Sequence, residues 1–281
     1  MLMHNYFIFN GIDSSRYGIR LSKVANYGAP ERDQNLIGVP GHNGDVINDN
    51  GRWKNRTETY ECSIAHNFKQ NFSAFRKELL ADPGYHRLED TYEPDEYYIA
   101  ALTGSIEPEY NPKHDAGSFR LTFTRKPQRF LKSGEIEIER INYTPNSFNI
   151  YNPTKFEAKP LYKVNCGSSD SIVILYVGGM DASVNGTAFK VYPILQTAFS
   201  GDSVGWNAAL SEGLWAYLDS ESGEAYAMYE ISGTPTVVNL NAGVSVNSSG
   251  KMPYLPGDQE TFVGHSGTGG KFTITPRWYE V

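Results

Sequence analysis

TETYECSIAHNFKQNFSAFRKELLADPG (residues 57–84) is a stretch in which the spacing of the apolar residues changes from that of a strand to that of a helix. Polar and apolar residues alternate from Thr57 to Ile64, which is typical of a half-buried strand. From Phe68 to Leu79 the apolar residues recur at spacings of four, three and four, which predicts an amphipathic helix. Asp82-Pro83-Gly84 then ends the helix, because proline cannot continue it. This stretch predicts one helix set among strands.

Turn sequences separate short predicted strands on the N-terminal side of this stretch. The strand predicted at Tyr6–Phe9 is followed by Asn10-Gly11, a pair that favours a two-residue hairpin turn. Farther on, Pro40-Gly41-His42-Asn43-Gly44 predicts a tight reversal that projects a β-hairpin. We also expect a turn at Asp49-Asn50-Gly51.

A change in pattern predicts two domains, residues 1–133 and 134–281. Pro127 and Ser133-Gly134 mark the change, and no helical stripe of comparable length follows. The second part reads as strands about ten residues apart with Gly, Pro and Asn turns, which is typical of a β-sandwich. It includes an expected hairpin from Trp215 to Ile231 and another from Phe262 to Phe272. The predicted fold class is mainly β.

The composition of the chain disfavours two classes of protein, those that bind nucleic acid and those that span a membrane. The 281 residues are 40% hydrophobic and 20% charged, as in an ordinary globular protein. The net charge of −7 disfavours nucleic acid as a partner, and no apolar run approaches the roughly 20 residues of a membrane helix. The first residues lack a signal-peptide pattern, so we expect folding in a reducing cytoplasm. Cys62 and Cys166 are expected to be small buried apolar residues.

No set of residues predicts catalysis, a cofactor or a metal, so the expectation is that the chain is not an enzyme. The six histidines lack metal-site spacing, and Ser14-Ser15 has no assignable base. The acidic run Glu89–Glu96 could supply paired carboxylates or calcium ligands, but a solvated loop is the favoured interpretation. Gly264–Gly270 lacks the helix that a phosphate-binding loop requires.

Taken in order, several motifs resemble those of the distal tail proteins of long-tailed, non-contractile bacteriophages and of related prophage tail proteins. His42 is a departure, because the family usually has Arg or Lys there. The matching motifs are Phe9-Asn10-Gly11-Ile12-Asp13-Ser14-Ser15-Arg16-Tyr17-Gly18-Ile19, Val39-Pro40-Gly41-His42-Asn43-Gly44-Asp45, Gly84-Tyr85-His86-Arg87-Leu88-Glu89-Asp90, Phe123-Thr124-Arg125-Lys126-Pro127, Asn152-Pro153-Thr154, Lys159-Pro160-Leu161, Leu218-Asp219-Ser220, Met252–Asp258 and Ile274–Trp278.

The resemblance implies an N-terminal β-sandwich-like domain with one helix and a β-hairpin arm, and a C-terminal galectin-like β-sandwich. Six copies of the first domain would close into a ring at the end of the tail tube. The ring would contact the tube protein on one side and the tail-tip hub protein on the other. The second domain would carry receptor-binding or baseplate proteins. The expected location is the virion tail tip, after assembly in the host bacterial cytoplasm.

A ring needs two different surfaces repeated around an axis, and strand edges can provide them. We therefore predict that the strand before the first turn and the hairpin tip contribute to subunit contacts, with the tip residues setting shape. The predicted interface residues are Tyr6, Phe7, Ile8, Phe9, Pro40, Gly41, Asn43 and Gly44.

Two other functions stay open at this point. A carbohydrate-binding module for host cell-surface glycan would use the aromatic residues of the second domain, with Trp206, Asn207 and His265 as the residues considered. A hydrolase acting on cell-wall glycan or peptide has no supporting set of residues.

Overall fold

The structure, a computed structural model, divides into two compact units: Met1–Phe130 with Val281, and Leu131–Glu280. The division lies close to the expected boundary after residue 133. The residues that the structure describes are 4–22, 28–141, 147–165, 174–178, 187–190, 214–231, 234–246, 250, 252–266 and 271–281.

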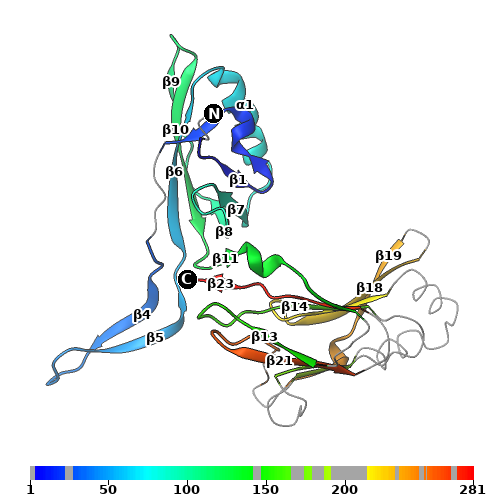
Figure 1. Cartoon of the computed structure of the whole chain (residues 1–281). Coiled ribbons are helices and arrows are strands. Elements are labelled where there is room, and N and C mark those ends of the chain that lie inside the picture. Colours follow the sequence, from blue (N-terminus) through cyan, green and yellow to red (C-terminus); the bar gives the residue numbers. More distant parts are fainter. Residues whose placement is uncertain are drawn as a thin grey trace. The chain divides into compact units, whose positions relative to one another are not determined.

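The first unit contains an antiparallel sheet, an α-helix and a separate two-stranded arm (Figure 1). The strands of the sheet follow the order β2-β1-β7-β8-β10-β6-β3, and β9 pairs with β10. The elements are β1 (Phe7–Phe9), β2 (Ile12–Asp13), the 3-10 helix η1 (Ser14–Tyr17), β3 (Ile19–Leu21), β4 (Arg32–Gly38), β5 (Asp45–Trp53), β6 (Arg56–Ile64), α1 (Phe68–Leu79), β7 (His86–Asp90), β8 (Glu96–Leu102), β9 (Glu109–Asn111), β10 (Ala116–Arg125) and β11 (Arg129–Leu131), which crosses the division along the sequence.

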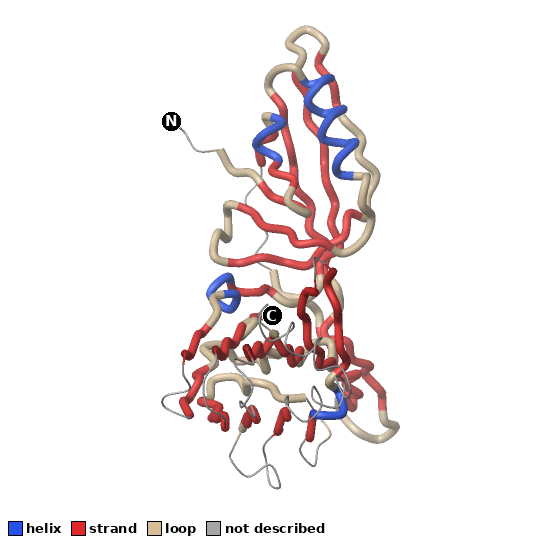
Figure 2. Tube along the Cα trace, turned by 90° about the vertical axis from the view of Figure 1, so that its right-hand side faces the viewer, coloured by secondary structure: helices blue, strands red, loops and turns tan. Residues whose placement is uncertain are grey.

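The predicted helix is confirmed, with its predicted apolar stripe buried. Phe68, Phe72, Phe75 and Leu79 are the buried residues of α1, which lies along the sheet in Figure 2. The Phe72 and Phe119 rings meet edge to face with centroids 4.9 Å apart, so the helix is held on the sheet by aromatic contacts.

The turn after β1 is also confirmed. Asn10 and Gly11 both have positive φ values, 50° and 77°, as a hairpin turn of this length requires. Phe9 consequently pairs with Ile12, and β1 and β2 form an antiparallel hairpin.

The turn expected at Asp49-Asn50-Gly51 is wrong. These residues lie within β5, which runs from Asp45 to Trp53 opposite β4. The register shifts between Asp33 and Gln34, and Gly51 has a φ of 75°. The turn-forming residues therefore mark an irregularity within the strand pairing, where glycine relieves the strain of a left-handed backbone.

The second unit contains two antiparallel sheets, which Figure 2 shows as two layers and which include all of its described strands except β23. One has the order β12-β22-β14-β17-β18-β19 and the other β13-β21-β15-β16-β20. The elements are η2 (Lys132–Glu135), β12 (Ile138–Ile141), β13 (Ser147–Tyr151), β14 (Leu161–Asn165), β15 (Ile174–Val177), β16 (Thr187–Lys190), β17 (Trp215–Asp219), β18 (Glu224–Ile231), β19 (Thr234–Asn239), η3 (Asn241–Gly243), β20 (Val244–Ser245), β21 (Glu260–Ser266), β22 (Lys271–Thr275) and β23 (Tyr279–Glu280).

One predicted hairpin of this unit is confirmed and the other is wrong. β17 pairs with β18, as expected for the region from Trp215 to Ile231. β21 and β22, by contrast, belong to different sheets, although they are neighbours in sequence. Gly264 to Ser266 belong to β21, which pairs with β13 and β15, whereas β22 pairs with β12 and β14. Residues 267–270 lie outside the described residues.

The mainly β fold with a helix and a hairpin arm is thus confirmed, while the galectin-like character of the second unit stays a prediction. Cys62 is buried in the first core, as expected, whereas Cys166 lies outside the described residues. Within the part of the chain that the structure describes, no helix has the length and apolar character needed to cross a membrane.

We expect Phe75→Ala to destabilise the first unit by about 3–5 kcal/mol, because the fully buried ring would leave a cavity. Urea unfolding followed by circular dichroism would measure the change. Lys77→Ala, at an exposed position of the same helix, is the matched control and should change stability by less than about 0.5 kcal/mol. Equal effects of the two substitutions would contradict the assigned helix orientation.

Candidate assembly interface

The arm formed by β4 and β5 is a two-stranded sheet of its own that extends from the start of β6 (Figure 1). An isolated two-stranded hairpin has marginal stability in water, because neither face is covered by a core. The contacts that order this arm must therefore lie along its own two strands or on another molecule.

Charged pairs join the two strands at the root of the arm. Arg32 Nη2 lies 2.8 Å from Asp49 Oδ2, and Arg32 Nε donates to both oxygens of that carboxylate at 3.1 and 2.9 Å. The Arg32 guanidinium also lies 5.0 Å from the centre of the Trp53 ring. Two further pairs connect the same segments, Arg52 Nε with Asp33 Oδ2 at 2.6 Å and Lys54 Nζ with Glu31 Oε1 at 2.8 Å.

The tip has the opposite character, because its large side chains are apolar and exposed. Leu36 pairs with Ile47 and Ile37 pairs with Val46 across the two strands. Their exposed fractions are 61% for Leu36, 60% for Ile47, 49% for Ile37 and 55% for Val46. Covering such side chains contributes roughly 1–2 kcal/mol each, so the tip is a surface that gains stability from a partner.

The tip turn contains half of the predicted interface residues. Pro40, Gly41, Asn43 and Gly44 are all exposed between β4 and β5. Gly41 and Gly44 have φ values of 83° and 84°, so both adopt a backbone conformation that favours glycine. The prediction that these residues shape a hairpin is confirmed, and their role in subunit contacts stays a prediction.

The other predicted interface segment, Tyr6–Phe9, lies in the main sheet rather than in the arm. β1 stands between β2 and β7, and the side chains of Phe7 and Phe9 are buried in the core. Tyr6 and Ile8 are half-buried. The structure does not bring this segment together with the tip turn, and the role of the segment in subunit contacts stays a prediction.

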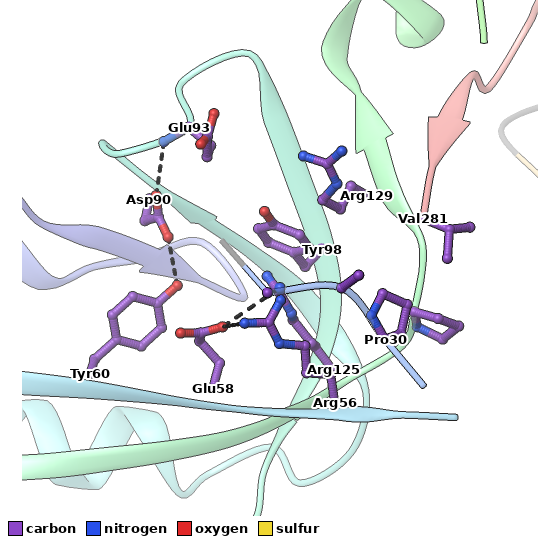
Figure 3. Close-up of a pocket in the computed structure, with 13 residues that line it drawn as sticks. Pro30, Arg56, Glu58, Tyr60, Asp90, Glu93, Tyr98, Arg125, Arg129 and Val281 are labelled. Atoms are coloured by element: carbon purple, nitrogen blue, oxygen red, sulfur yellow. Dashed lines mark hydrogen bonds and ion pairs between the residues drawn. The ribbon is translucent and has the colours of Figure 1, made fainter. Parts of the chain in front are cut away.

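A small cavity of about 140 Å³ lies in the first unit, at the end of the sheet where β6 begins (Figure 3). It was not predicted from the sequence, although the alternation of β6, continued two residues before Tyr60, would have placed Glu58 on the buried face. Its lining residues are Gly28, Ala29, Pro30, Arg56, Glu58, Tyr60, Asp90, Glu93, Tyr98, Arg125, Pro127, Arg129 and Val281.

Three charged side chains meet at this cavity, and of these Glu58 and Arg125 are buried and Arg56 is half-buried. Arg56 and Arg125 are direct cross-strand partners on β6 and β10, an arrangement in which like charges repel. Glu58 offsets the repulsion, with Oε2 at 3.8 Å from Arg56 Nη2 and 3.6 Å from Arg125 Nη2. Burial, followed by the nearby charge of Arg125, lowers the pKa of Arg56. The Arg125 guanidinium also lies 4.1 Å from the centre of the Tyr98 ring.

The acidic run that was expected to be a solvated loop is partly built into this site, so that expectation is wrong. Tyr60 Oη donates to Asp90 Oδ2 at 2.6 Å, and Asp90 Oδ1 accepts the backbone N–H groups of Tyr92 and Glu93 at 2.9 and 3.1 Å. Arg129 Nη1 lies 3.2 Å from both carboxylate oxygens of Glu96. These carboxylates are used in structural bonds that fix the connection between β7 and β8.

The protonation of the buried groups fits a structural role. Burial, and then the Asp90 charge, raise the pKa of Tyr60 well above its ordinary value, so this hydroxyl stays a donor. Burial also raises the pKa of the Cys62 thiol, which keeps it from acting as a nucleophile. Among the described residues, no group of three or more His, Cys, Asp or Glu side chains is placed to hold a metal ion.

The carbohydrate-binding alternative stays a prediction, because the residues considered for it are not among those whose side chains are described. Trp206 and Asn207 lie outside the described residues, as does the side chain of His265. Trp278 is buried in the core of the second unit.

Glu58→Gln should destabilise the first unit by about 3–5 kcal/mol, because it removes the buried negative charge that lies between Arg56 and Arg125. Glu61→Gln, on the opposite face of β6, is the control and should have little effect, since its pair with Arg120 is at the surface. Chemical unfolding of both variants would measure the difference. Wild-type stability of Glu58→Gln would contradict the role given to this carboxylate.

Acidification should loosen the root of the arm. The side chains of Arg52 and Asn50 lower the pKa of Asp33, and Arg32 with the Gly51 N–H lowers that of Asp49. A lowered pKa in the folded state stabilises the arm above the unfolded-state pKa, near 4, and this stabilisation is lost as pH falls through the lower folded value.

Methyl NOEs between Leu36 and Ile47 should therefore weaken below about pH 4 in the wild type. In the Asp33→Asn/Asp49→Asn variant they should already be weak at neutral pH and show no such transition. NOEs that keep their full intensity at about pH 2 would contradict this account.

The sequence matches no protein-family model and no curated protein. Among solved structures, the SPP1 Dit protein, described as a paradigm of the hub adsorption apparatus in phages infecting Gram-positive bacteria, superposes with a TM-score of 0.65. The two are 10% identical, and the match covers 97% of this chain and 98% of Dit.

Two structures of the phage p2 baseplate in its activated conformation also contain a similar chain. The one with strontium has a TM-score of 0.48 at 12% identity, covering 97% of both chains, and the one with calcium has 0.47 at 11%, covering 97% and 98%. These scores are too low for a comparison in detail. The match to SPP1 Dit, which spans both units, shows that this chain has the fold of a Dit-type phage tail protein.

Proposed function

We propose that this chain is a structural hub subunit at the distal end of a phage tail, where six copies close into a ring. The observation that carries the proposal is the full-length likeness to the SPP1 Dit fold. It covers both units at once, which a chance match of one common sandwich would not.

The arm supports an assembly role in its own right. Exposed apolar side chains at the tip and a charged, ordered root are what a projecting contact element requires. A heterologous contact made by such an arm repeats from one copy to the next, and it closes when the rotation between copies divides a full turn. The arm is therefore a natural part of a ring interface.

The proposed position at the distal end of the tail defines the partners of the chain. The ring joins the tail tube protein on one side and the tail-tip hub protein on the other, and the second, galectin-like unit carries receptor-binding or baseplate proteins. The chain acts by assembly at the virion tail tip and catalyses no reaction.

The test is the mass of the purified chain, alone and with a tail partner, by light scattering or native mass spectrometry. We expect a species near six times the monomer mass of 31.4 kDa in at least one of these conditions. Monomers in both conditions would reject the ring.

Gly44→Val should impair ring formation while leaving the second unit folded, because valine is strained at a φ of 84°. Gly223→Val is a matched control: Gly223 also has a positive φ, 78°, lies in open space and belongs to the turn between β17 and β18. Ring mass and one-dimensional NMR of both variants would check this. An unaltered ring with Gly44→Val would show that the shape of the tip turn is not needed.

A further inference from the structure

The apolar residues of the arm tip lie on both of its faces. Cross-strand partners share a face, and successive residues of a strand alternate between faces. Leu36 and Ile47 therefore project to one side, and Ile37 and Val46 project to the other. All four are about half exposed or more, so neither face is covered by the rest of the chain that the structure describes.

A partner that covers one face of the arm would leave the other in water. An arm resting on a single surface is expected to be apolar on one side and polar on the other, as in an amphipathic strand pair. The tip departs from that pattern, and a ribbon with two apolar faces fits between two surfaces.

The low charge of the tip indicates which molecule provides the two surfaces that cover it. Between Gln34 and Asn48 the only formal charge at neutral pH is Asp45, because the charged side chains of the arm are gathered in pairs at the root. A chain with a net charge of −7 repels its own copies. An almost uncharged tip is the part of this chain that another copy can approach at the least electrostatic cost.

The described surface of the first unit also offers apolar residues that the tip could meet on such a copy. Leu80 and Tyr85 are exposed just after α1, and Tyr110 is exposed on the short strand β9. These residues lie outside the arm, so a contact between them and a tip would be heterologous, as a ring requires.

We infer that the arm tip is a two-sided plug, inserted between two other copies of this chain so that each of its apolar faces is covered by a different subunit. The inference rests on the proposed ring and adds to it that each arm ties together three subunits.

The test places one negative charge on each face in turn. Leu36→Asp charges the first face and Ile37→Asp the second. Asn35→Asp and Asn48→Asp are the controls, because these two cross-strand partners add the same charge nearer the root without removing an apolar residue and without facing another carboxylate. We expect both apolar substitutions to raise the ring dissociation constant by tenfold or more, and both controls to change it by less than about threefold.

Photo-crosslinking gives a second measurement that does not depend on a destabilising charge. Leu36→p-benzoylphenylalanine and Ile37→p-benzoylphenylalanine should each crosslink to another copy of the chain, and peptide mapping should find a different surface for each position. Together with the dissociation constants, this would establish contact on both faces.

Several outcomes would overturn the inference. An effect confined to one face, or crosslinks from both positions to one surface, would show an arm that lies on a single neighbour. A ring that tolerates both substitutions but no longer binds a tail partner would assign the tip to that partner. In each case the wild-type ring is present, so the proposed function would stand; a wild-type chain that never forms a ring would reject both.

Discussion

The alternation of β6 is the constraint on which the first unit depends. One face of this strand carries Tyr60, Cys62 and Ile64 into the core under α1, and its full length pairs with β10. Only two residues, Lys54 and Asn55, separate the end of β5 from the start of this strand. The arm is thus a direct continuation of a strand fixed by core packing, which gives an otherwise unsupported hairpin a firm attachment.

At the arm end of β6, contacts between charged side chains replace the apolar packing of the core. Glu58 occupies the next buried position of β6 toward the arm, and there the apolar core is replaced by its contacts with Arg56 and Arg125. Beyond this point the root of the arm is held by exposed ion pairs, each worth little alone. Along β6 and the arm, the first unit therefore changes from a packed core to a charged root and then to a tip with exposed apolar side chains.

The features that could be predicted from the sequence are those set by local physics. The spacing of Phe68, Phe72, Phe75 and Leu79 specifies the helix face, and the glycines of the tip turn specify a reversal. Strand partnership was not predictable in this way: the Gly-rich connection after β21 favours a turn but does not show that β22 joins the other sheet.

The residues of the candidate interface differ in the same way, because some are set by local sequence and others by contacts distant in sequence. The tip turn could be found from its residues, but the burial of Phe7 and Phe9 depends on which strands flank β1, and that is decided by contacts distant in sequence. In the cavity, the Tyr60 hydroxyl and the Asp90 carboxylate bind each other, a contact that depends on the packing of β6 against β7 and could not be read from the sequence. The apolar side chains at the tip are not covered by any of the described residues, and association with another apolar surface would remove them from water.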